Sequence, residues 1–331
     1  MKCKHPIVID KKKPDIAFPC GQCLHCRINK RRVWASRIML ESMLYLDNAF
    51  VTLTYNDQNL PESFENKKTG QVYAPCSVNP DHHKEFMYRL RTLYRRKTGK
   101  NIRFFAVGEY GEQTGRPHYH YALFNFPISS GRGYGNERFN NNRCFIHDLV
   151  QKAWSDPKTK EPYGNVHIGT LTHDSAQYIA GYVTKKMTSD NTDLQQEYLQ
   201  GRHPEFTRQS RRPGIGADYA NLISKRLTRH EHNEYSLVPN HIKHGSKKRP
   251  LGRYMMDKIY EDLQIQFEHG DRLKLYERVL RSVLANAEYD SDEVKKTALS
   301  GSLSLALEKI NQQYNTNIES KLNFFNKRKI I

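Results

Sequence analysis

The stretch from residue 103 to residue 124 constrains the fold most, because it holds two strand-like runs joined by a short turn. The first run is RFFAVGEY (103–110) and the second is HYHYALF (118–124); both are rich in aromatic and other apolar residues. The loop between them, GEQTGRP (111–117), contains two glycines and a proline. The sequence therefore predicts an antiparallel β-hairpin.

The returning strand of this hairpin carries two histidines that should share one face. Successive side chains alternate along a strand, so His118 and His120 are expected about 7 Å apart on the same side. If the turn is symmetric about residues 113 and 114, Glu109 stands opposite His118 on that face, whereas Glu112 lies in the turn itself. One carboxylate and two imidazoles with open positions suit Mg²⁺ or Mn²⁺. A hydrogen-bonded surface pair is the ordinary alternative for two such histidines.

The segment YIAGYVTKKM (178–187) carries two tyrosines on a predicted helix that spans residues 174–187. Tyr178 and Tyr182 are four residues apart and so lie on one helical face, which Lys185 shares. A phenol with a pKa of about 10 is a weak nucleophile at neutral pH. A neighbouring lysine and a metal-bound phosphate would both activate it. The alternative is a tyrosine pair that packs the helix on a sheet.

Two further features of this helix lead to expectations. Asp174 and Gln177 have the spacing of a capping box. Gly181 costs the helix about 1 kcal/mol relative to alanine. Its small size would let a DNA strand or the sheet approach closely.

Other segments predict the elements around these motifs. Apolar residues at helical spacing indicate a helix over 27–46, and FVTLTY (50–55) indicates a buried strand. Asn79-Pro80-Asp81 is a helix start signal. The stretches 208–216 and 243–253 are expected to be basic, glycine-bearing linkers, and the pattern is helical from about Met255 almost to the end.

The charge of the chain favours a polyanionic partner. The formal net charge is +18, from 53 Lys and Arg against 35 Asp and Glu, which favours nucleic acid before acidic membrane surface. The 20 Tyr and 14 Phe include candidates for stacking on single-stranded bases. No apolar run approaches the roughly 20 residues of a membrane span, and the N-terminus has no secretory signal pattern. No phosphate-binding loop of the type that ATP-driven helicases use is present.

Four cysteines near the N-terminus indicate a metal site. Disulfides are rare in a cytoplasm, and four thiolates fit a closed tetrahedral zinc site. His5 or His25 is able to replace one thiol, and an iron–sulfur cluster or unligated cysteines remain alternatives. The four residues are Cys3, Cys20, Cys23 and Cys26.

Three of these motifs occur in a recognisable order. FVTLTY (50–55), RPHYHYALF (116–124) and YIAGYVTKK (178–186) resemble motifs one, two and three of the HUH superfamily of rolling-circle replication initiators, in its two-tyrosine form. PCGQCLHC, GEYGEQTGRPHYH and RRPGIG also resemble the replication initiation proteins of gokushovirus-type microviruses. The resemblance covers about residues 1 to 260.

This resemblance implies an α+β fold in which a central antiparallel sheet of the HUH endonuclease, RRM-like, type is flanked by helices. We expect a Cys-rich zinc-binding arm and basic helix over 1–46, the endonuclease domain over 47–200, and a basic linker with a mostly helical region over 201–331. Tyr119 departs from the usual motif because its bulky side chain has a polar tip.

The resemblance also implies a function. The protein would bind the phage origin, nick one strand through a tyrosine, form a 5′-phosphotyrosine link, start rolling-circle replication and rejoin the displaced strand into circles. His118, His120 and Glu109 would hold the Mg²⁺ or Mn²⁺. In this family a lysine often stands three residues after each tyrosine; here Gly181 takes that place for Tyr178 and Lys185 for Tyr182, which favours Tyr182 as the nucleophile.

The expected partners are single-stranded or duplex origin DNA, a host helicase and the host replication machinery, in the cytoplasm of a bacterial host and without a membrane. The DNA-contacting residues are expected to include Arg116, Lys186, Arg211 and Arg212. A non-catalytic zinc-containing DNA-binding protein would explain the charge and the cysteines. An HUH-type transposase or relaxase shares the chemistry, although relaxases usually carry the tyrosine ahead of the histidine motif.

Overall fold

The computed structural model divides into two compact units. One unit comprises Met1–Asn29, Leu227–Val238 and Tyr260–Ile331, and the other comprises Lys30–Arg226 and Pro239–Ile259. The second unit contains the main sheet with the helices that pack on it. The structure describes residues 3, 5–8, 17–111, 113–128, 138–139, 142–143, 147–185, 199–229, 238–244 and 247–263.

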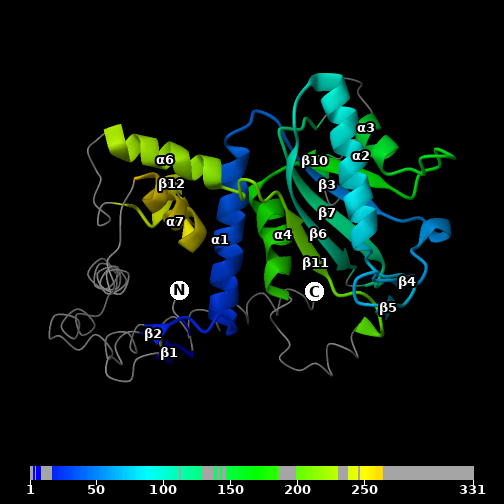
Figure 1. The fold of residues 1–331 in the computed structure, drawn as a ribbon, viewed down its shortest axis with the longest axis horizontal. Coiled ribbons are helices and arrows are strands. Elements are labelled where there is room, and N and C mark those ends of the chain that lie inside the picture. The colour runs from blue at the N-terminus through cyan, green and yellow to red at the C-terminus, as the bar shows by residue number, and fades with distance from the viewer. Residues whose placement is uncertain are drawn as a thin grey trace. The chain divides into compact units, whose positions relative to one another are not determined.

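A five-stranded antiparallel sheet forms the centre of the second unit, in the order β10-β3-β7-β6-β11 (Figure 1). Strands β6 and β7 form the hairpin that the sequence predicted, and β7 is the middle strand. The edge strand β11 includes part of the stretch 208–216 that was predicted to be a linker. That prediction was wrong there, because Phe206 is buried and the strand pairs with β6. The strands are β3 (Asn48–Thr54), β6 (Arg103–Tyr110), β7 (Pro117–Phe124), β10 (Val166–Thr170) and β11 (Phe206–Gln209).

Helices cover both faces of this sheet, as the α+β prediction required. Figure 1 shows α2 and α3 on one side and α4 on the other, where α1 also packs. The expectation of helices on 27–46, after Asn79 and on 174–187 is confirmed over the described residues. The described helices are α1 (Leu24–Ser42), α2 (Pro80–Thr98), α3 (Asp148–Ala153), α4 (His173–Lys185), α6 (Ala217–Arg229) and α7 (Gly252–Asp262).

Local capping fixes where α2 begins. The Asn79 side chain accepts a hydrogen bond from the Asp81 N–H at 2.8 Å, with Pro80 in the first turn. The start signal that these three residues form in the sequence is therefore confirmed.

The capping box of α4 lies two residues before the predicted one. Thr172 N–H donates to Ser175 Oγ at 2.9 Å, and Ser175 N–H donates to Thr172 Oγ1 at 3.2 Å. The prediction of Asp174 with Gln177 was therefore wrong, since the Thr172–Ser175 pair already satisfies these positions.

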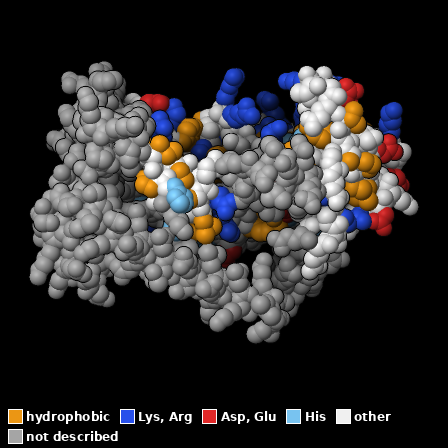
Figure 2. Space-filling model, turned by 90° about the horizontal axis from the view of Figure 1, so that it is seen from below, with side chains coloured by type: hydrophobic (Ala, Val, Ile, Leu, Met, Phe, Trp, Pro, Cys, Tyr) orange, Lys and Arg blue, Asp and Glu red, His pale blue; other side chains and the backbone are white. Residues whose placement is uncertain are grey.

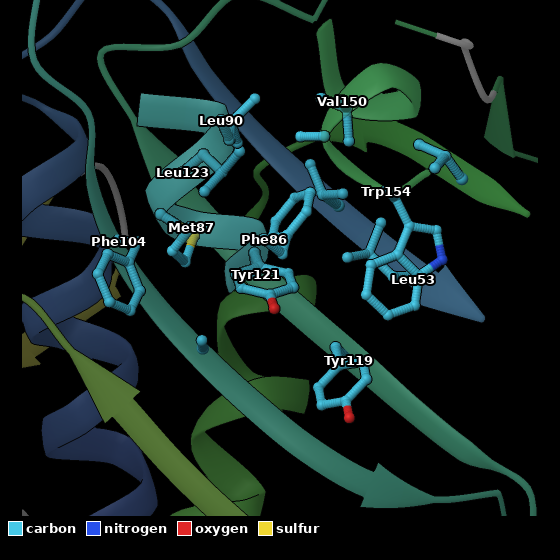
Figure 3. Packing of buried hydrophobic residues seen from close by; sticks show 14 of the residues in the cluster. Leu53, Phe86, Met87, Leu90, Phe104, Tyr119, Tyr121, Leu123, Val150 and Trp154 are labelled. Atoms are coloured by element: carbon cyan, nitrogen blue, oxygen red, sulfur yellow. The ribbon is translucent and has the colours of Figure 1, made fainter. Parts of the chain in front are cut away.

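The two faces of the sheet bury different apolar sets. On the α2 and α3 face, Tyr119 and Tyr121 pack with Phe86 and Trp154 (Figure 3). On the α1 and α4 face, strand residues such as Phe105 pack with the helices. Since side chains alternate along β7, the tyrosines at 119 and 121 place the histidines at 118 and 120 on the α4 face.

A buried carboxylate ties α1 to the segment that follows β11. Glu41 is fully buried, pairs with Arg103 at 2.5 Å and accepts the Gly216 N–H at 2.7 Å. Arg103 also donates to the carbonyl of Pro213 at 3.0 Å. The motif RRPGIG (211–216) thus contributes backbone groups that hold a helix of this unit in place.

Several shorter elements complete the described chain. The stretch 243–253, predicted as a linker, instead contains most of a hairpin and the start of α7, because β12 and β13 pair with each other. The helix predicted from Met255 onward is described only as far as Asp262 within α7, and the rest of it lies outside the described residues. The short elements are β1 (Ile7–Val8), β2 (Ala17–Phe18), η1 (Asp57–Asn59), β4 (Phe64–Glu65), β5 (Val72–Tyr73), β8 (Arg138–Phe139), β9 (Asn142–Arg143), β12 (His241–His244) and β13 (Lys247–Pro250).

Two general properties of the described part of the chain bear on function. Lys and Arg side chains lie at several separate places on the face shown in Figure 2. Among the described helices, none combines the length and apolar character that crossing a bilayer requires.

Candidate active site

The hairpin places a carboxylate opposite the first histidine. In the β6–β7 register Glu109 pairs with His118, as the symmetric turn predicted. Glu112 lies outside the described residues. On the other side of β7, Thr52 of β3 pairs with His120. Three neighbouring strands therefore contribute polar side chains to one region of the α4 face.

His120 is held by hydrogen bonds at both ring nitrogens. Its Nε2 lies 2.6 Å from Glu109 Oε1, and its Nδ1 lies 2.9 Å from Thr52 Oγ1. The ring is parallel to that of His118, with centroids 6.4 Å apart and an interplanar angle of 6°. Partners on both nitrogens fix the rotation of the imidazole. Sequence reasoning missed Thr52, although its place in the strand FVTLTY was a usable signal.

Helix α4 brings both tyrosines to this carboxylate. The Tyr178 hydroxyl donates to Glu109 Oε1 at 2.8 Å and lies 3.5 Å from His120 Nε2. The Tyr182 hydroxyl donates to the Tyr178 hydroxyl at 3.0 Å. The imidazole pair and the phenol pair, about sixty positions apart in the chain, are thus joined by one chain of hydrogen bonds.

The two tyrosines differ in exposure. Tyr178 is 44% exposed, whereas Tyr182 is 8% exposed. Burial raises the pKa of Tyr182, and the hydrogen bond and charge of Glu109 raise it further. Tyr178 is therefore the phenol that an incoming strand can reach, and Tyr182 stands behind it.

Glu109 is ionised in this site in spite of its burial. Burial alone would raise the pKa of Glu109, but the hydrogen bond and charge of His120, together with the hydroxyls of Tyr182 and Tyr178, lower it below its ordinary value. Burial lowers the pKa of His118, and the neighbouring His120 lowers it further. A carboxylate beside a neutral imidazole is the protonation state that metal ligands need.

Two buried polar atoms in this group lack a hydrogen-bond partner among the described residues. They are Glu109 Oε2 and His118 Nδ1. Unpaired buried acceptors are costly, so an oxygen and a nitrogen left in this state fit a bound cation. The Glu109, His118 and His120 ligand atoms are not among the groups of the described structure that converge within 4.8 Å.

Gly111 follows β6 and lies close to His118. A Cβ added at this glycine would come within 3.0 Å of His118 Cε1. The absence of a side chain thus lets the hairpin turn close over the imidazole. The glycine in the quoted stretch GEYGEQTG was the available sequence signal.

Gly181 faces an arginine of α1. Arg31 Nε donates to the Gln177 carbonyl at 2.8 Å, and it would lie 3.6 Å from a Cβ added at Gly181. A spacing of 3.6 Å is ordinary contact. The neighbour of Gly181 is therefore α1, in place of the sheet or DNA strand that its size suggested.

The polar tip of Tyr119 has a structural explanation. Its side chain is fully buried on the α2 face. The hydroxyl accepts the Asn79 N–H at 2.8 Å, donates to the Asn79 carbonyl at 3.1 Å and lies 3.0 Å from the Tyr55 hydroxyl. Tyr119 therefore anchors the start of α2 beneath the strand that carries the histidines.

The predicted DNA-contacting residues are distributed differently. Arg116 pairs with Asp57 at 2.5 Å and donates to the Tyr55 carbonyl at 2.9 Å, which ties the hairpin turn to the segment after β3. Arg211 and Arg212 are exposed. Lys186 and the side chain of Lys185 lie outside the part of the chain that the structure describes.

The four N-terminal cysteines converge in the first unit. Their Sγ atoms all lie within 4.8 Å of one another. The Cys3–Cys23 and Cys20–Cys26 sulfur pairs are 3.8 Å and 4.0 Å apart, close to the spacing of about 3.8 Å that a tetrahedral zinc site with Zn–S bonds of about 2.3 Å requires. This cluster is able to hold a metal such as zinc, and the geometry gathers four thiols without His5 or His25.

Comparisons with known proteins agree with this arrangement. Residues 48–187 match the family of replication-associated proteins that is named for ORF2 and the gene 2 protein. The chain is 31% identical over 254 residues to replication-associated protein VP4 of Bdellovibrio phage phiMH2K, covering 75% of this chain and 69% of that protein. It is 29% identical to replication-associated protein ORF2 of Spiroplasma virus 4, covering 85% and 82% respectively.

A third relative is replication-associated protein ORF4 of Chlamydia phage 1, with 24% identity over 63% of this chain and 47% of that protein. No solved structure matches significantly. The matched range 48–187 contains the strand, the hairpin and the helix from which the candidate site is built. The chain therefore belongs to the family of microvirus replication-associated proteins.

Proposed function

We propose that this protein is a replication initiator of the HUH endonuclease type. It binds the origin of a phage genome, nicks one strand through a tyrosine, starts rolling-circle replication and rejoins the displaced strand into circles. The observation that carries this proposal is the hydrogen-bonded chain from Tyr182 through Tyr178 and Glu109 to His120. The replication-associated names of its relatives support it.

The proposed reaction is a transesterification. The Tyr178 oxygen forms a bond to phosphorus, the bond from phosphorus to the 3′ oxygen breaks, and the phenol proton is lost while the 3′ oxygen gains one. The products are a 5′-phosphotyrosine link and a free 3′-hydroxyl, which primes synthesis. Because the ester keeps the bond energy, rejoining the strand requires no nucleotide cofactor.

Glu109 and His120 position the attacking phenol. Glu109 Oε1 accepts the Tyr178 proton at 2.8 Å, and a hydrogen bond to a carboxylate increases the electron density on the phenol oxygen. His120 is fixed by Thr52 on its other side. The phenol is thus oriented before a strand arrives, which is how a rigid site lowers a barrier.

The exposure of the tyrosines supports a division of roles. We assign the first cleavage to Tyr178, which is exposed and contacts Glu109, and the second transfer to Tyr182. This order reverses the preference for Tyr182 that rested on Lys185. A second phenol 3.0 Å from the first allows the regenerated origin to be cut while the first ester still holds the strand.

The site also suits a divalent cation. Glu109, His118 and His120 would hold Mg²⁺ or Mn²⁺, which supplies Lewis-acid stabilisation of the charge on the scissile phosphate. We further assign a structural Zn²⁺ to Cys3, Cys20, Cys23 and Cys26, whose sulfur spacing supports it.

The partners follow from this reaction. The net charge of +18 suits origin DNA. Since the sequence has no ATP-binding loop of the helicase kind, we propose that a host helicase opens the duplex and that the protein acts in the cytoplasm of its bacterial host.

A covalent-adduct assay tests the proposal. Single-stranded oligonucleotides that tile the genome encoding this protein are incubated with it and Mn²⁺, and the mixture is separated on a denaturing gel. One oligonucleotide should give a protein–DNA band, and Tyr178→Phe/Tyr182→Phe should lose that band while retaining DNA binding. His118→Ala should bind DNA and fail to cleave it.

Two results would contradict the proposal. An adduct that persists in the double tyrosine variant would remove the nucleophile assignment. Absence of any adduct from the wild-type protein, with DNA binding intact, would instead indicate a non-catalytic DNA-binding protein.

A further inference from the structure

A second polar cavity lies beside the helix that carries the tyrosines. Its volume is about 270 Å³. It is bounded by α1, by the first turns of α4 and by β13 with the residue that ends it. The lining residues are Arg32, Ser36, His173, Gln177, Lys248, Arg249 and Pro250.

The lining of this cavity is cationic. It contains Arg32, Lys248 and Arg249 and no carboxylate among the described residues. Arg249 is 5% exposed, its Nη1 lies 3.0 Å from His173 Nδ1, and burial lowers its pKa. A buried guanidinium is stabilised by a negative partner, and the fork of an arginine matches the oxygens of a phosphate.

Ser36 provides an independent sign of a ligand. Its side chain is 1% exposed, it lines the cavity, and its Oγ has no hydrogen-bond partner among the described residues. A buried hydroxyl normally finds a partner. A hydroxyl and three cations around one space form a donor set for an oxyanion.

The position of the cavity indicates which anion. Gln177 lines it and directly precedes Tyr178 on α4. Arg31 of α1, the neighbour of Arg32, donates to the Gln177 carbonyl, so α1 and α4 are joined at the same turn. A volume of 270 Å³ holds about nine waters at roughly 30 Å³ each, which is ample for one phosphodiester group.

We propose that this cavity binds a backbone phosphate of the DNA strand next to the phosphate that Tyr178 attacks. The proposal rests on the proposed function, because it assigns a subsite for the same strand. Contacts to a phosphate carry no base preference and fix the register of the strand. The cavity therefore positions the scissile bond over the phenol by holding the strand one or a few nucleotides away.

Charge-neutral variants test this assignment. Arg32→Gln/Lys248→Gln removes two exposed cations of the cavity, and Arg96→Gln/Lys100→Gln removes two exposed cations from the end of α2 and the residues after it. Both variants change the net charge equally. Binding of a fluorescein-labelled single strand is measured by anisotropy without divalent cation, over a range of NaCl concentrations.

The cavity variant should bind about tenfold more weakly than the control variant, with a salt slope smaller by about 0.7 for each phosphate that the protein no longer neutralises. Ser36→Ala should also weaken binding while leaving the melting temperature unchanged or slightly raised, since its hydroxyl bonds to none of the described residues. Equal binding and equal salt slopes in the cavity and control variants would overturn the proposal.

A methylphosphonate scan distinguishes a DNA phosphate from a free anion. A neutral linkage is placed at each position of the oligonucleotide in turn. One position should weaken wild-type binding and have no further effect in Arg32→Gln/Lys248→Gln. If no position behaves this way, and inorganic phosphate alone protects the wild type but not the variant from thermal unfolding, the cavity is a free-anion site and the assignment to DNA is wrong.

The two proposals fail separately. If the wild-type protein forms no covalent adduct but the cavity variant still loses affinity and salt slope, the nicking function fails and the phosphate site stands. If the adduct forms normally and the cavity variant binds like the control, the phosphate site fails and the nicking function stands.

Discussion

Replacing the two tyrosines one at a time should give unequal effects on the first cleavage. Tyr178→Phe leaves Tyr182 as the only phenol of the pair, and that side chain is 8% exposed with a pKa raised by burial and by Glu109. Each unit by which a pKa rises reduces the reactive phenolate about tenfold at a given pH. Since the strand must also reach a covered side chain, we expect the first cleavage to slow by about 100-fold or more.

Tyr182→Phe should have a much smaller effect on the first cleavage. It removes one hydrogen bond, in which the Tyr182 hydroxyl donates to the Tyr178 hydroxyl at 3.0 Å. One such bond contributes about 1 kcal/mol, equivalent to roughly fivefold in rate. The same variant should fail in the second transfer, so it should accumulate the covalent adduct and release no closed circles.

Single-turnover kinetics measure both steps. A 5′-labelled oligonucleotide that contains one origin reports the first cleavage, and an oligonucleotide with two origins reports strand joining. Melting curves of both variants control for folding. If Tyr178→Phe cleaves at the wild-type rate and Tyr182→Phe does not cleave, the reasoning from burial is wrong and Lys185 selects the nucleophile as the sequence suggested.

Three further predictions address stability and metal binding. The pKa of Glu109 is lowered in the folded protein, so its ionised form stabilises the fold above the unfolded pKa of about 4.3, and this contribution is lost as pH falls through the folded pKa. Melting temperatures of Glu109→Gln should therefore fall less than those of the wild type between about pH 5 and pH 3, and parallel curves would contradict this. Tyr119→Phe removes a hydroxyl that bonds Asn79 in the core; it should cost about 2 kcal/mol and lower the melting temperature by about 4–8 °C, whereas an unchanged melting temperature would show that water replaces it. Elemental analysis should find about one zinc per wild-type chain and substantially less in Cys23→Ser, and a metal-free but folded wild type would refute the cysteine site.

Local patterns in the sequence determined much of the sheet and its active face. The hairpin register followed from the turn, which placed Glu109 opposite His118. Alternation along one strand then put the histidines on one face and Tyr119 on the other. These results need only the period of a strand and the length of a turn, both of which are set by neighbouring residues.

The same patterns misled where local signals were ambiguous. The basic stretches at 208–216 and 243–253 read as linkers, yet they include parts of β11 and of the β12–β13 hairpin. Basic residues are compatible with an edge strand because its outer side faces solvent. Whether such a stretch pairs depends on the strand that it meets, which composition does not specify.

By itself the sequence determined the hairpin, the shared face of the two histidines, the helical spacing of the two tyrosines and a set of four cysteines able to meet. Only the tertiary structure decided that Tyr178 contacts Glu109 while Tyr182 is covered, and that Ser36, His173 and Arg249 line one cavity. The physical reason is the range of the interactions. Periodicity fixes which way a side chain points from its own element, whereas burial and partners arise from the packing of apolar faces that come from distant parts of the chain.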